Sequence, residues 1–97
     1  MAEQIGPGSL KCVTGSSSGR SLGSVIEETL SSHVRAEDIR RLYDEVVLVY
    51  TEADTAAIRD WLASLLANGE SVFVLEFERW SGYGAAPDRD WLRRRGH

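Results

Sequence analysis

The chain has 97 residues, carries a formal net charge of −4, and 27% of its residues are charged. This length suits one domain with a single core and excludes a multidomain protein. Cys12 is the only cysteine, which excludes an internal disulfide and a zinc site built from cysteines or from Cys and His. No apolar run approaches the roughly 18 residues that span a bilayer, and the N-terminal sequence lacks the segments of a secretory signal, so we expect a soluble cytoplasmic protein.

The N-terminal third predicts a leader, a short strand, a loop and a helix. Residues 1–9 include a Gly-Pro-Gly run without apolar periodicity and predict a flexible leader. Residues 10–14 (LKCVT) predict a short strand, and residues 15–21 (GSSSGRS) predict a flexible loop. A helix follows, because apolar and small residues recur along one stripe: Val25, Ile26, Thr29, Leu30, His33 and Val34.

A second short helix is predicted over residues 36–43. Ile39, Leu42 and Tyr43 lie there at helical spacing, but on a different stripe from the preceding helix. We therefore expect the chain to turn near Arg35 toward the next strand.

The segment from Glu45 to Trp80 predicts a strand, an amphipathic helix and a second strand. Val46 to Tyr50 is an apolar, β-branched run typical of a central strand that is covered on both faces. The helix is indicated by one apolar face, with Asp54 as a cap and Asn68-Gly69 as a stop: Ile58, Trp61, Leu62, Leu65 and Leu66. In Ser71 to Glu78, alternate residues lie on opposite faces, with Phe73, Leu75 and Phe77 on one of them.

These elements predict an α/β fold. Two consecutive strands joined through a helix run parallel and cross over right-handed, so we expect a βαβ unit over residues 45–80. The predicted sheet is small, single-layered and mostly parallel, with two or three strands and two or three additional short helices. Residues 10–80 form the domain, and residues 81–97 form a loop and a short basic, aromatic C-terminal segment.

Carboxylates follow the two strands of the predicted βαβ unit. Glu52 and Asp54 come after the first strand, and Glu76 and Glu78 end the second. Ligands of open parallel sheets bind beyond the carboxyl ends of the strands, where carboxylates can hold Mg²⁺ or act as acid and base. The same residues also suit a plain structural role at a helix N-terminus and a solvated strand end. A minimal nucleotide- or Mg-binding enzyme module is therefore an alternative interpretation.

The C-terminal segment interleaves aromatic and arginine side chains. Residues 79–97 carry five Arg and two Asp, a net +3, whereas residues 1–78 carry a net −7. Tyr, Trp and Arg dominate the energetics of protein interfaces. These residues could equally close a small core, and they could also contact nucleic acid, which the acidic body disfavours. The candidate partner-binding residues are Arg79, Trp80, Tyr83, Arg89, Trp91, Arg93, Arg94 and Arg95.

Two further sets of residues have simpler interpretations. The loop TGSSSGRS, residues 14–21, lies between a predicted strand and helix, where phosphate can bind, but it does not match the phosphate-loop pattern. Cys12, His33 and His97 lack an orienting third group, so we predict no nucleophilic site there.

Together these observations favour a non-catalytic accessory or adaptor protein over an enzyme. We expect it to bind another protein, or a second copy of itself, through the C-terminal segment and exposed sheet edges, because a small sheet has unpaired edges. No metal, cofactor or membrane contact is expected, and the acidic body makes nucleic-acid association a third, weaker alternative.

Overall fold

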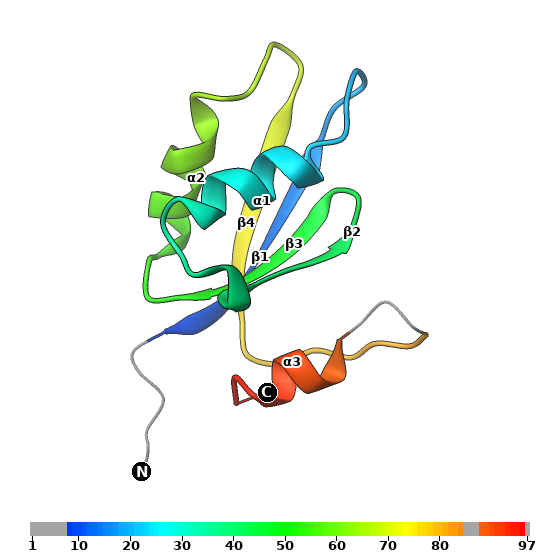
Figure 1. Ribbon diagram of the computed structural model, residues 1–97. Coiled ribbons are helices and arrows are strands. Elements are labelled where there is room, and N and C mark those ends of the chain that lie inside the picture. The colour runs from blue at the N-terminus through cyan, green and yellow to red at the C-terminus, as the bar shows by residue number, and fades with distance from the viewer. Residues whose placement is uncertain (1–7, 85–87, 97) are drawn as a thin grey trace.

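A computed structural model describes residues 8–84 and 88–96 of the chain. Figure 1 shows two helices against one face of a sheet, and a short C-terminal helix beneath it. The elements in chain order are β1 (Ser9–Ser16), α1 (Gly23–Ser31), the 3-10 helix η1 (Ala36–Asp38), β2 (Ile39–Tyr43), β3 (Val46–Thr51), α2 (Thr55–Ala63), β4 (Ser71–Phe77) and α3 (Arg89–Arg93).

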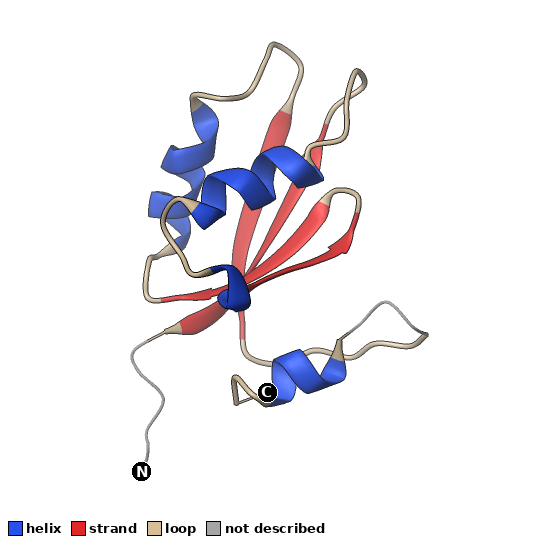
Figure 2. Ribbon diagram, in the orientation of Figure 1, coloured by secondary structure: helices blue, strands red, loops and turns tan. Residues whose placement is uncertain are grey.

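The four strands form one antiparallel sheet in the order β2-β3-β1-β4. Strand β1 lies between β3 and β4 and runs antiparallel to both. This βαββαβ arrangement is the split βαβ topology of ferredoxin-like folds, which hosts many unrelated functions. The alternation of strands and helices is visible in Figure 2.

The predicted parallel sheet of two or three strands is therefore wrong. β3 and β4 are joined through α2, but they are not neighbours, because β1 is inserted between them. The prediction assumed that consecutive strands pair with each other. Residues 9–16 instead supply an eight-residue central strand, longer than the short strand predicted over residues 10–14.

The predicted helix over residues 36–43 is also wrong. Only Ala36–Asp38 is helical, as one 3-10 turn, and Ile39–Tyr43 is strand β2. Residues Asp44 and Glu45 connect β2 to β3, so residues 39–51 form a hairpin. Ile39 packs in the core through cross-strand pairing opposite Val49, and not through a helical stripe.

The two larger helices agree with their sequence patterns. Asp54 caps α2, because its Oδ1 accepts a hydrogen bond from the amide of Ala57 at 2.8 Å. The regular helix ends at Ala63, earlier than the apolar pattern suggested, and Gly69 takes the left-handed conformation (φ 85°) ahead of β4. Gly23 begins α1 close to the hairpin turn, since a Cβ atom there would lie 1.9 Å from the Asp44 carbonyl oxygen.

The sheet separates two apolar clusters. The larger cluster lies between the sheet and helices α1 and α2, on what we call the helix face, and it contains Val13, Leu22, Ile26, Leu30, Ile39, Val47, Val49, Ile58 and Leu62. The smaller cluster lies on the opposite face, here called the second face, and it contains Leu10, Leu48, Trp91 and Leu92. Helix α3 thus covers only part of the second face, and the rest of that face is open to a ligand or partner.

Candidate functional site

The side chains of the second face form three rows that run straight across the sheet. The first row is Phe77, Leu10 and Tyr50; the second is Leu75, Cys12, Leu48 and Arg40; the third is Phe73, Thr14, Val46 and Tyr43. The first row lies in the cluster that α3 covers. Exposure increases toward the third row, where Phe73 is 66% exposed and Tyr43 is 54% exposed. Phe73 and Tyr43 stand at the two ends of this row, on the two edge strands, so each edge of the second face carries an exposed aromatic side chain.

An apolar groove of about 380 Å³ continues this open row toward α3. Its floor comes from the sheet and its far wall comes from Leu92 and the segment after β4. The lining residues are Cys12, Leu42, Tyr43, Leu48, Leu75, Phe77, Arg79, Trp80, Ser81, Gly82, Tyr83 and Leu92. Burial raises the pKa of the Cys12 thiol, so this side chain acts as a small apolar group in the floor.

Helix α3 is fixed to the β2 side of the second face by packing and hydrogen bonds. Trp91 is only 2% exposed, and its indole Nε1 donates a 2.8 Å hydrogen bond to the Glu37 carbonyl oxygen. Arg95 stacks over the Trp91 ring, donates to the same carbonyl oxygen, and pairs with Asp38 at 2.9 Å. The predicted partner-binding residues Trp91 and Arg95 are therefore part of the protein's own structure.

The other predicted partner-binding residues lie on the surface around the groove and α3. Arg79, Trp80 and Tyr83 line the groove, and the Tyr83 side chain is 97% exposed. Arg89, Arg93 and Arg94 are exposed on α3 and the turn that follows it. Three of the eight predicted residues thus line the groove beside the sheet. Tyr43, Phe73 and Leu75, which lie on the exposed part of the second face, were not among the predicted site residues.

The alternative ligand site at the carboxyl ends of β3 and β4 is organised around a lysine. Lys11 is 2% exposed, and its Nζ donates hydrogen bonds to Ser9 Oγ at 2.7 Å and to the Thr51 carbonyl oxygen at 2.8 Å. Burial lowers the Lys11 pKa, and the charges of Glu76 and Asp54 oppose that shift.

This lysine changes the interpretation of the predicted carboxylates. Glu76 lies directly opposite Lys11 across the β1–β4 pair, and Asp54 caps α2. Glu52 and Glu78 are exposed. The Lys11 ammonium group supplies positive charge near Asp54 and Glu76, and ligand binding by the four carboxylates stays a prediction. Among the described residues, no group of three or more His, Cys, Asp or Glu side chains is placed to hold a metal ion.

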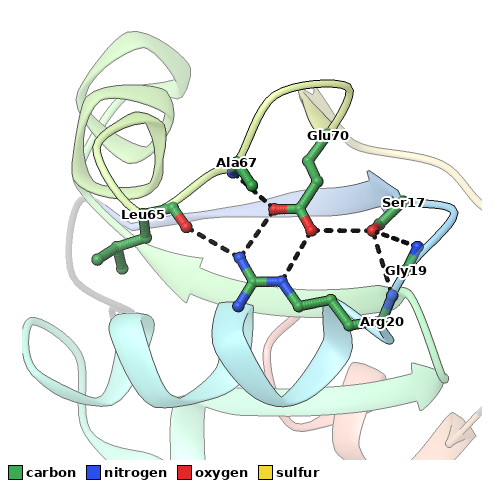
Figure 3. A network of polar contacts seen from close by, with 6 residues as sticks. All are labelled: Ser17, Gly19, Arg20, Leu65, Ala67 and Glu70. Atoms are coloured by element: carbon green, nitrogen blue, oxygen red, sulfur yellow. Dashed lines mark hydrogen bonds and ion pairs between the residues drawn. The ribbon is translucent and has the colours of Figure 1, made fainter.

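The glycine-rich loop after β1 is occupied by a carboxylate from elsewhere in the chain. Figure 3 shows Arg20 and Ser17 directed at Glu70, which precedes β4. Arg20 donates through Nε and Nη2 to the two Glu70 oxygens, both at 2.8 Å, and Ser17 Oγ donates at 2.9 Å. The Ala67 amide donates to the same carboxylate at 2.8 Å.

These contacts lower the pKa of Glu70 to about 2, with the Arg20 hydrogen bond as the largest cause. The loop donors that an external phosphate would require are therefore already directed at Glu70. The network instead joins the β1–α1 loop to the start of β4.

The remaining candidate residues do not assemble. The His33 ring stacks on Trp61 with centroids 3.9 Å apart, on the helix side of the sheet, whereas Cys12 belongs to the second face. His97 lies outside the described residues. The two described residues are therefore on opposite faces of the sheet and form no Cys/His pair.

Comparisons with protein-family models, with curated proteins and with solved structures found no match for this chain. Within the described part of the chain, no helix has both the length and the apolar character needed to cross a membrane.

Proposed function

We propose that this chain is a non-catalytic accessory protein that binds another protein chain through the open part of its second sheet face. The observation that carries the proposal is the exposure of Phe73 beside Leu75, on a strand at the edge of the sheet and next to the apolar groove. Burying aromatic and aliphatic side chains of this kind supplies most of the free energy of protein association.

The composition of this surface favours protein over nucleic acid. Nucleic-acid modules with a four-stranded sheet stack bases on aromatic side chains of the sheet. Here the central strands β1 and β3 present Cys12, Thr14 and Val46 in the two more open rows, and the chain has a net charge of −4. A phosphate backbone would find little positive charge on the sheet itself.

Site-specific photocrosslinking tests the proposal. p-Benzoyl-phenylalanine replaces Phe73 in the full chain expressed in cells, and the matched control replaces Leu65, which is 47% exposed on the turn after α2. We expect ultraviolet light to produce discrete, protease-sensitive adducts from position 73 and none, or far fewer, from position 65. Absence of a protein adduct at position 73, or equal yields at both positions, would contradict the proposal.

A further inference from the structure

Strand β4 presents hydrogen-bonding groups at the edge of the sheet. The Gly15 amide donates to the Glu45 carbonyl oxygen at 3.0 Å, which assigns the odd-numbered residues of β1 to hydrogen bonding with β3. Since antiparallel strands alternate the direction of their backbone groups, the even-numbered residues of β1 bond to β4. Their partners in β4 are Ser71, Phe73, Leu75 and Phe77.

The amide and carbonyl groups of Val72, Val74 and Glu76 therefore point away from the sheet. Among residues 8–84 and 88–96, β4 is the outermost strand on this side, so a further strand could pair with these groups. A seven-residue edge strand with only one charged residue lacks the lysines, prolines and bulges that usually prevent such pairing.

The sequence of β4 is complementary to itself in one antiparallel register. If Val74 pairs with Val74 of a second strand, all seven residues find a partner, and the outward-pointing residues form the hydrogen-bonded pairs. Phe73 then lies opposite Leu75 on the second face, at a position without cross-strand hydrogen bonds, where opposed side chains approach most closely. Glu76 lies opposite Val72, which keeps the two Glu76 carboxylates apart.

From this complementarity we infer that the protein partner is a second copy of this chain, paired antiparallel through β4 about a two-fold axis at Val74. The inference rests on the proposed function and specifies its partner. The two sheets combine into one of eight strands, and the exposed Phe73 and Leu75 side chains of both copies form a continuous apolar strip. A two-fold arrangement also closes the contact, so it does not propagate into fibres.

The charges at the ends of the paired strands do not prevent this register. The same register places Glu78 of one copy opposite Glu70 of the other. Glu70 is already paired with Arg20 of its own chain at 2.8 Å, which reduces the like-charge repulsion between the two carboxylates.

Engineered disulfides test both the partner and the register. In a Cys12→Ser background, Val74→Cys places two thiols across the two-fold axis with Cα atoms about 5.5 Å apart, within the range of a disulfide. The matched control, Ser71→Cys, places its two thiols six residues apart along the strands, roughly 20 Å. We expect mild oxidation to convert most of the Val74→Cys protein to a covalent dimer and little of the Ser71→Cys protein. Equal conversion of the two variants, or none with Val74→Cys, would overturn the inferred register.

Sedimentation equilibrium of the unmodified chain and of Phe73→Lys provides the second measurement. We expect the apparent mass of the unmodified chain to double with rising concentration, and Phe73→Lys to stay monomeric with an unchanged circular dichroism spectrum. A chain that stays monomeric while position 73 crosslinks to a different protein would overturn the inference and leave the proposed function standing. Absence of both self-association and crosslinking would contradict both.

Discussion

The two edges of the sheet are built in opposite ways. β2 has five residues, carries Arg40 and Arg41, and contains a register shift between Arg41 and Tyr43. β4 has seven regularly paired residues and only one charge, at Glu76. Short length, positive charges and bulges are the features by which natural sheets prevent edge pairing. The comparison indicates that the protein blocks pairing at one edge and leaves the other edge able to pair.

Helix α3 packs on the second face beside β2, and Trp91 anchors it there. Removing this anchor should have the largest effect on stability. Trp91→Ala deletes a buried aromatic side chain and the hydrogen bond to Glu37. We expect the free energy of unfolding to fall by about 3–5 kcal/mol, as for other buried Trp or Phe truncations. Urea denaturation measures this loss, and the matched control Tyr83→Ala, at a 97% exposed position, should change stability by less than about 0.5 kcal/mol. Similar losses of stability for the two variants would mean that packing of α3 on the second face does not stabilise the protein.

Proline substitutions in β4 should distinguish the bonded side of that strand from its free side. Leu75→Pro removes an amide that bonds to β1, whereas Val74→Pro removes one that points away from the sheet. We expect Leu75→Pro to be more destabilising than Val74→Pro by about 2 kcal/mol, because it breaks the ladder and leaves an acceptor in β1 unpaired. Thermal unfolding followed by circular dichroism gives the comparison, and the reverse order would show that the assigned amide directions are incorrect.

The start of β4 is held by Glu70, which should make stability depend on pH in the acid range. The folded-state pKa of Glu70 is lowered to about 2 from an ordinary value of 4.5, so folding favours the carboxylate. Its stabilising contribution is fully present above about pH 4.5 and is lost as the pH falls toward about 2. Glu70→Gln should flatten this part of the profile of urea midpoint against pH, whereas Glu28→Gln on the exposed surface of α1 should not. Parallel profiles for the unmodified chain and Glu70→Gln would contradict the role of this network.

The sequence predicted local structure better than the arrangement of strands. The cap at Asp54 and the two faces of residues 71–77 are confirmed, because each depends on a few neighbouring residues. The strand order depends on which distant segments pair. Lys11 interrupts the apolar pattern of β1, since its side chain is buried through hydrogen bonds and not through apolar contacts. The short strand predicted over residues 10–14 was therefore not recognised as the central strand that separates β3 from β4.

The candidate site could be predicted from the sequence only in part, because it too depends on which distant segments pack together. Arg79, Trp80 and Tyr83 were predicted as partner-binding residues from the composition of the C-terminal segment, and partner binding stays a prediction. The structure places them at a groove whose other residues come from several strands. The alternation within residues 71–77 placed Phe73 and Leu75 on one face but could not show that α3 stops short of them. Exposure of Phe73 is a property of tertiary packing, and no periodicity within the strand encodes it.

The smallest expected effect concerns the charge on the protected edge. Arg40 Nη2 pairs with Asp88 Oδ2 at 2.8 Å, and the two side chains are 44% and 32% exposed. Solvent screening limits such surface pairs, so Arg40→Gln should lower the free energy of unfolding by no more than about 1 kcal/mol, and less at high salt. Because the bulge and α3 remain, the variant should self-associate no more strongly than the unmodified chain in sedimentation experiments. If Arg40→Gln instead drives assembly beyond dimers, the charge of Arg40 alone prevents edge pairing at β2. The short length and the bulge of β2 would then not contribute to the difference between the two edges.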